Sequence, residues 1–334
     1  MHFHQHPHLS RFRPALFLLL SLLVAALFLA DLFAGPVEIP LREVWAILTG
    51  GNSYNPDWDL IIWEIRIPKA ITALLCGAGL SVGGLLTQSL FRNPLTGPDV
   101  LGLTSGAGLG VAIALMAGIS GTYSVTLSAS AGAAFSFLLI SLAATKVINN
   151  TLLILGLMLS AFTSGIISVL QYATESTRLQ QYTIWTLGSI STASGDQLIM
   201  LSVVVLVGLG IGFGSLKSLN ASALSESYLF TMGLDPGRLR WQVLLATSLI
   251  TGTITAICGP VTFIGIAGPH LVKQFFRITD HRLLLPLSAL SGAALVLLCD
   301  LLSQLPGSGS VLPLNAVTAL FGAPMVIWVI LKSK

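Results

Sequence analysis

Long apolar runs separated by short polar segments dominate the chain. A helix needs about 20 apolar residues to cross a bilayer, whereas membrane β-strands show shorter alternating segments. The runs here are long and continuous, so they predict an all-α, polytopic membrane protein with about ten transmembrane helices. The expected spans are residues 15–34, 70–90, 99–118, 124–145, 151–172, 196–214, 240–258, 261–276, 283–304 and 312–331.

Two segments depart from this pattern. The run at 261–276 is short and contains Gly265, Gly268 and Pro269, which predicts a discontinuous membrane helix or a re-entrant segment. The stretch Leu179–Ile190 is too short to span, and we expect an amphipathic helix near one membrane face.

Composition supports lipid as the main solvent of this chain. Of 334 residues, 54% are apolar and 9% are charged, with a mean hydropathy of +0.88. A soluble domain carries about a quarter charged residues, so this composition excludes an ordinary soluble protein. In lipid, helices satisfy all of their backbone polar groups internally.

Charge predicts the orientation of the spans, because cytoplasmic loops are enriched in lysine and arginine. With the N-terminus inside, twelve of the 16 basic residues fall on the cytoplasmic side, and the other four are Arg42, Arg66, Lys69 and Arg178. We therefore expect a bacterial inner-membrane protein with both termini in the cytoplasm. The first apolar run is longer than a usual signal-peptide core and lacks a clean cleavage site, so it is expected to be a retained span.

The N-terminal tail, residues 1–14, carries histidines at every second position: His2, His4, His6 and His8. Such a pattern can bind metal, and metal titration of the tail peptide would test this. We favour a cytoplasmic tail without a transport role, followed by one transmembrane domain over residues 15–334.

Three loop motifs are not explained by helix packing. Arg66 and Lys69, in Arg-Ile-Pro-Lys, place two cations one helical turn apart on the outer side, as snorkelling residues or as a docking point for acidic side chains of a soluble partner. Residues 92–99, which include Arg92, Asn93 and Pro94, predict a rigid turn. The third motif is the longest cytoplasmic loop, at about 215–239.

In that third loop, Asn220 or Ser222 is expected to cap a short helix that runs to about Thr231 and ends at Gly233. A short helix parallel to the membrane in the largest inner loop suits a coupling element. The alternative is a solvated linker.

The sequence lacks the residues that several other classes of function require. No phosphate-binding loop occurs, and not even a Gly-Lys pair, so ATP hydrolysis must take place on another chain. An ion-driven carrier needs ionisable groups at mid-membrane, whereas Asp31 and Asp300 are expected near the outer ends, in reach of water. An intramembrane enzyme needs a nucleophile or metal constellation. His270 is expected to be structural, no metal site is predicted, and single cysteines within apolar runs are expected to be small buried hydrophobes: Cys76, Cys258 and Cys299.

Five motifs in order resemble the FecCD/BtuC-type permeases. These permeases are the membrane subunits of type II ABC importers for iron-siderophore complexes, haem and vitamin B12. The resemblance covers about residues 60–334. Its motifs are R-I-P-K at 66–69, R-N-P-L-x-x-P-D-x-L-G at 92–102, the loop at 215–239, F-I-G-x-x-x-P-H at 263–270 and G-A-P at 322–324.

The resemblance implies a permease subunit that forms the passage for a metal chelate, most naturally an iron-siderophore complex or haem, and not an enzyme. Vitamin B12 is the alternative cargo, and an ion-coupled secondary transporter is a more distant alternative. The implied partners are a second permease copy in a homodimer or heterodimer, two cytoplasmic ATPase subunits that hold ATP and Mg²⁺, and a periplasmic or lipid-anchored substrate-binding protein. No cofactor is expected in this chain.

The resemblance also implies roles for single residues. Arg66 and Lys69 would meet acidic residues of the binding protein, although Lys69 replaces the usual arginine and Gln304 stands where another docking arginine occurs. Span five would line the passage. The other implied roles are ATPase coupling at Ala221, Ser222, Ala223, Leu224, Ser225 (where glycine is usual), Glu226 and Gly233; a cytoplasmic gate at Asn149, Asn150 and Thr151; and structural motifs at Arg92, Asn93, Pro94, Pro269 and His270.

Overall fold

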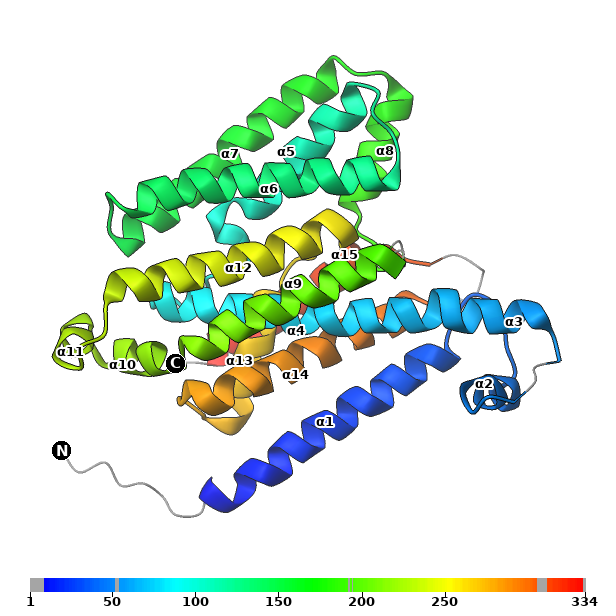
Figure 1. The fold of residues 1–334 in the computed structure, drawn as a ribbon, viewed down its shortest axis with the longest axis horizontal. Coiled ribbons are helices and arrows are strands. Elements are labelled where there is room, and N and C mark those ends of the chain that lie inside the picture. Colours follow the sequence, from blue (N-terminus) through cyan, green and yellow to red (C-terminus); the bar gives the residue numbers. More distant parts are fainter. Residues whose placement is uncertain (1–8, 52–53, 192, 194, 305–310, 333–334) are drawn as a thin grey trace.

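The computed structural model describes residues 9–51, 54–191, 193, 195–304 and 311–332, and every regular element in those ranges is helical (Figure 1). In chain order, the elements are α1 (Leu9–Phe33), α2 (Leu41–Leu48), α3 (Pro56–Leu60), η1 (Ile61–Arg66), α4 (Ile67–Phe91), η2 (Pro98–Leu101), α5 (Leu103–Met116), α6 (Thr122–Ala144), α7 (Asn149–Tyr172), α8 (Ser176–Thr186), α9 (Gly195–Gly214), α10 (Leu216–Leu224), α11 (Glu226–Thr231), α12 (Pro236–Cys258), α13 (Ile264–Phe276), α14 (His281–Ser303) and α15 (Leu314–Lys332).

The ten expected spans correspond to ten of these helices. Among the described residues, seven helices are long and apolar enough to cross a membrane, and α5 and α15 are shorter apolar helices. The eighth span, α13, is only 13 residues long and contains Pro269, as its glycine and proline pattern predicts. The short α8 lies where the interfacial helix is expected. The all-α, polytopic fold is confirmed.

The starts of two spans differ most from the sequence expectations. The second span does not begin at residue 70, because α3, η1 and α4 run on as one helix of 36 residues from Pro56 to Phe91. Arg66 and Lys69 therefore lie within this helix and not at its start. Helix α1 begins at Leu9, six residues before the expected span, and the N-terminal histidines lie outside the described residues.

Helix α4 occupies the centre of the bundle, where it packs against α14, α12, α13 and α9 (Figure 1). Small residues allow the closest approaches. A Cβ atom at Gly77 would collide with the carbonyl of Gly292 on α14, and one at Gly84 would collide with the carbonyl of Gly265 on α13. Close backbone packing of this kind replaces the hydrophobic driving force that is absent between helices in lipid.

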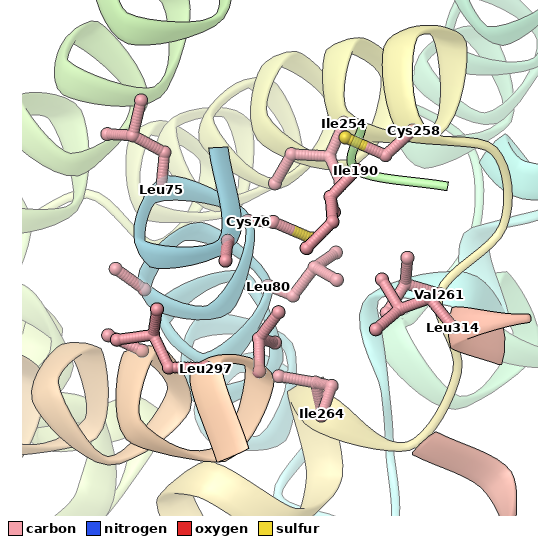
Figure 2. Close-up of a cluster of buried hydrophobic side chains, with 14 of the residues drawn as sticks. Leu75, Cys76, Leu80, Ile190, Ile254, Cys258, Val261, Ile264, Leu297 and Leu314 are labelled. Atoms are coloured by element: carbon pink, nitrogen blue, oxygen red, sulfur yellow. The ribbon is translucent and has the colours of Figure 1, made fainter. Parts of the chain in front are cut away.

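The core around α4 is apolar and closely packed. Figure 2 shows Cys76 and Leu80 of α4 among Ile254 of α12, Leu297 of α14 and neighbouring aliphatic side chains. All three cysteines are buried, so their expected role as small hydrophobes is confirmed.

Helices α5, α6, α7 and α8 form a separate group on one side of the bundle, and α1 lies on the opposite side (Figure 1). Helix α7 leaves large apolar side chains uncovered: Phe162 is 68% exposed and Val169 is 70% exposed. A surface of this kind in a membrane protein faces lipid or another subunit.

Candidate functional site

Arg66 closes the end of α1. Its guanidinium is buried and donates to the backbone carbonyls of Leu32 at 2.8 Å, Phe33 at 3.1 Å and Val37 at 2.6 Å. The last carbonyls of a helix lack intrahelical partners, and the negative end of the helix dipole favours a cation there. Gly35 leaves the necessary room, because a Cβ at this position would lie 2.8 Å from a guanidinium nitrogen. Arg66, the last residue of η1, therefore joins the end of α1 to the long helix that continues as α4.

Lys69 lies at the centre of a buried polar cluster between α1, α4 and α14. Its Nζ is 2.6 Å from Oδ2 of Asp300 and 3.7 Å from Oδ1 of Asp31. The Gln304 amide donates to Asp31 Oδ1 at 3.0 Å and to Asp300 Oδ2 at 2.9 Å. Two carboxylates are thus held by one ammonium and one amide.

These contacts correct one expectation and leave another open. Asp31 and Asp300 do not reach water, because they are 1% and 2% exposed and are paired with Lys69. The docking role of Arg66 and Lys69 stays a prediction. The bonds described above occupy both side chains with partners in their own chain. Gln304 bonds the same cluster.

The turn after α4 is rigid for identifiable reasons. Arg92 ends the helix in the left-handed region at φ 49°, and the Asn93 side chain accepts from the amide of Leu95 at 3.0 Å. Pro94 and Pro98 restrict the backbone that follows. The Arg92 guanidinium donates to the carbonyl of Ser222 on α10 at 2.9 Å, which joins this turn to the longest loop.

That loop contains two short helices and not one. Ser225 has an extended backbone at φ −168° that separates α10 from α11, and its hydroxyl accepts from the amide of Tyr228 at 2.9 Å. The expected caps Asn220 and Ser222 instead lie inside α10. Gly233 follows α11 at φ 68°, as expected for the residue that ends it.

A side-chain network fixes α10 to the start of α14. Asn220 donates to Asp280 at 2.7 Å and accepts from both the backbone amide and the ring Nδ1 of His281, at 2.9 and 2.8 Å. His281 also contacts the Ser89 hydroxyl of α4 at 2.8 Å. A displacement of α10 must therefore act on α4 and α14 together.

The outer surface of the same loop is apolar and uncovered. Leu224 is 68% exposed and Phe230 is 69% exposed, and Tyr228 and Met232 are more than 40% exposed. The loop is thus held firmly on its inner side and presents aromatic and aliphatic groups outward. Contact surfaces for protein partners have this composition.

The predicted gate residues lie at the start of α7. Asn149 donates to the carbonyl of Leu90 on α4 at 3.3 Å, and Asn150 and Thr151 are exposed. Their gating role stays a prediction.

Pro269 and His270 are buried within α13, where Gly268 packs against Ser81 of α4. The residues that the structure describes contain no group of three or more metal-ligating side chains of the His, Cys, Asp and Glu types.

The sequence interpretation missed the two polar networks. One signal was available for the first of them: Asp31, Lys69 and Asp300 all occur close to the same ends of their expected spans. The network of Asn220, Asp280 and His281 had no comparable signal, because an amide in a polar loop has many local partners.

Comparisons with known proteins support one family. The FecCD transport family matches residues 22–332. The chain is 33% identical over 320 residues to the vitamin B12 import system permease protein BtuC of Escherichia coli O9:H4 (strain HS), with 95% of both chains covered. BtuC of Shigella flexneri is also 33% identical, over 319 residues.

A solved structure of a metal-chelate type ABC transporter in an inward-facing conformation has the same fold. It superposes with a TM-score of 0.86 at 28% identity, covering 96% of this chain and 99% of the solved chain.

Proposed function

The chain belongs to the FecCD transport family and is an ABC importer permease, and we propose that two copies of it form the passage for a metal chelate across a bacterial inner membrane. The proposed cargo is an iron-siderophore complex or haem, and both termini face the cytoplasm. A partner subunit hydrolyses ATP with Mg²⁺, since this sequence has no phosphate-binding loop.

The observation that carries this proposal is the construction of the loop that holds α10 and α11. Arg92 and Asn220 bond it to α4 and α14, whereas Leu224 and Phe230 face outward. A coupling element needs both properties, because it must bind a cytoplasmic ATPase and transmit its movement to the spans. Residues Ala221–Glu226 and Gly233 are the proposed coupling segment.

At the opposite end, the proposed partner is a substrate-binding protein. In this proposal, Arg66 and Lys69 lie close to the surface that contacts the binding protein. They can pair with acidic groups of the binding protein only if they give up their present bonds within the chain. Span five, α7, lines the passage, with Asn149, Asn150 and Thr151 at its cytoplasmic gate. The uncovered apolar side chains of α7 support a contact with the second permease copy.

Vitamin B12 is the second candidate cargo. The identity of 33% to BtuC along 95% of the chain favours it. The likeness to a transporter of the metal-chelate type supports the broader class to which both cargoes belong.

The test of the coupling role is a directed cross-link. Phe230→Cys in the full chain is expected to cross-link to a co-purifying ATPase subunit, and Phe135→Cys on α6 serves as the control because Phe135 is also exposed. The native cysteines are buried and do not compete. Equal cross-linking at both positions, or none at Phe230, contradicts the proposal.

The cargo is tested separately. The ligand held by the binding protein that co-purifies with the transporter is identified by mass spectrometry and absorption. An iron chelate supports the first candidate, and a corrinoid supports the second.

A further inference from the structure

A cavity of about 430 Å³ lies at the end of the bundle that holds α10, between the end of α4, α10, the end of α13 and the start of α14. These four segments gather at one end of the molecule in Figure 1. The volume is within the range of cavities that hold small organic ligands, and it exceeds the need of a single inorganic ion. Ser222 and Ala223 of the proposed coupling segment line part of this cavity, but the roles proposed above assign no ligand to it.

Three cations line the cavity: Arg92, Lys273 and Arg277. Their described bonds go to neutral groups. The Lys273 ammonium donates to the Gln88 side-chain oxygen at 3.0 Å, and Arg92 donates to the carbonyl of Ser222.

Among the side chains that the structure describes, a set that does not include Glu226, no carboxylate pairs with these cations, and the three ion pairs involve Lys69 and Arg178. Asp280 is close in sequence, but it does not line the cavity, and its Oδ1 accepts from Asn220 and from the amide of Arg282. The like charges that line this cavity repel one another, and a bound anion reduces that repulsion.

The remaining wall of the cavity combines polar and apolar side chains. Leu219 of α10 and Leu284 of α14 are fully buried behind it, whereas Ile278 between α13 and α14 is half-buried and Ala223 of α10 is exposed. A small hydrated anion gains nothing from the apolar groups in this wall. Cations beside aliphatic groups instead suit an amphiphile with an anionic head.

We propose that this cavity binds the phosphate headgroup of an anionic phospholipid. Arg92, Lys273 and Arg277 bind the phosphate, and the glycerol and first acyl carbons contact Ile278 and Ala223, the apolar lining residues that are not fully buried. Basic pockets between membrane helices on the cytoplasmic side bind anionic lipids. The proposed orientation places this cavity on the cytoplasmic side. Because α10 forms one wall, the bound lipid braces the proposed coupling loop against α13 and α14.

The test measures lipid retention by the full chain. The protein is purified in detergent and titrated with phosphatidylglycerol, with phosphatidylcholine of the same acyl chains, or with inorganic phosphate, and bound molecules are counted by native mass spectrometry. We expect one strongly retained phosphatidylglycerol, weak retention of phosphatidylcholine, and no displacement by phosphate.

Two matched variants locate the site. The double variant Lys273→Gln with Arg277→Gln is expected to weaken phosphatidylglycerol binding about thirtyfold, since each basic group at a lipid headgroup contributes about a factor of five. Lys217→Gln with Arg238→Gln removes the same charge from exposed positions at the same end that do not line the cavity, and it leaves binding unchanged. Arg277→Gln alone, at an exposed residue, gives about a fivefold loss and covers the case in which the double variant misfolds.

Three outcomes overturn the proposal. Equal retention of the two lipids removes the preference for an anionic head. Displacement of the lipid by inorganic phosphate assigns the cavity to a free anion. Equal losses in the cavity variant and in the control variant place the lipid elsewhere on the surface.

Discussion

Basic residues are used differently at the two ends of this bundle. At the end near α2, Arg66 donates to three carbonyls of its own chain and Lys69 is held between two buried carboxylates. At the end near α10, Arg277 is exposed, and Arg92 is exposed apart from its bond to α10. Arg66 and Lys69 maintain the fold at the first end, whereas Arg277 at the second end remains available to ligands and partners. Equivalent charges in a sequence can therefore have opposite roles, depending on whether the surrounding helices supply acceptors.

The largest expected effect comes from Lys69→Met. It leaves Asp31 and Asp300 buried without their cation, and breaking a buried pair in this way costs about 3–5 kcal/mol. We expect a strong loss of thermal stability and of folded protein in detergent. Lys146→Met, at an exposed lysine, is the control and has little effect. Equal stability of the two variants would show that the cluster is not structural.

Arg66→Lys is expected to have the second largest effect. An ammonium cannot reach all three carbonyls that the planar guanidinium binds, and a buried acceptor left unpaired costs about 1–3 kcal/mol. Differential scanning fluorimetry should show a lower Tm than for Arg238→Lys, a substitution at an exposed arginine. A Tm equal to that of the Arg238 variant removes Arg66 from the set of structural cations.

Phe230→Ser tests the other end of the comparison. Phe230 is 69% exposed, so its loss leaves the Tm unchanged and removes an apolar group from the proposed ATPase contact. We expect substrate-stimulated ATP hydrolysis of the assembled transporter to fall about tenfold, the usual scale for an aromatic contact residue. Phe135→Ser is the control, and a similar fall in both variants would argue against a specific contact.

The smallest effect is expected from Ser225→Ala. The hydroxyl caps α11 by accepting from the amide of Tyr228, and loss of such a cap costs about 1 kcal/mol. Hydrogen exchange at the amides of α11 should become faster while α10 is unchanged. Ser191→Ala, at an exposed serine near the other end, provides the reference, and unchanged exchange in α11 would disprove the cap.

Much of the fold could be predicted from local features of the sequence. Apolar runs identify the spans, and the glycines and proline of residues 264–276 identify the short α13. The turn at Arg92, Asn93 and Pro94 is also local, because proline and asparagine restrict the backbone wherever they occur.

The polar networks could not be predicted in the same way. Gln304 bonds Asp31 across 273 residues of sequence, and the contact exists only once α1, α4 and α14 have packed. Asn220 is a residue type that often caps helices, but in the folded chain its side chain bonds Asp280 and His281 and does not cap a helix. The cap therefore falls on Ser225, which local propensity alone does not favour over Asn220 or Ser222.

The central claim is that this chain is a passage whose energy source is another subunit. The most direct test measures uptake of the metal chelate into proteoliposomes that contain the chain, its co-purifying ATPase and its binding protein. We predict uptake only with internal ATP and the ATPase present, together with ATP hydrolysis stimulated by the loaded binding protein. Uptake by this chain alone under an ion gradient would contradict the account.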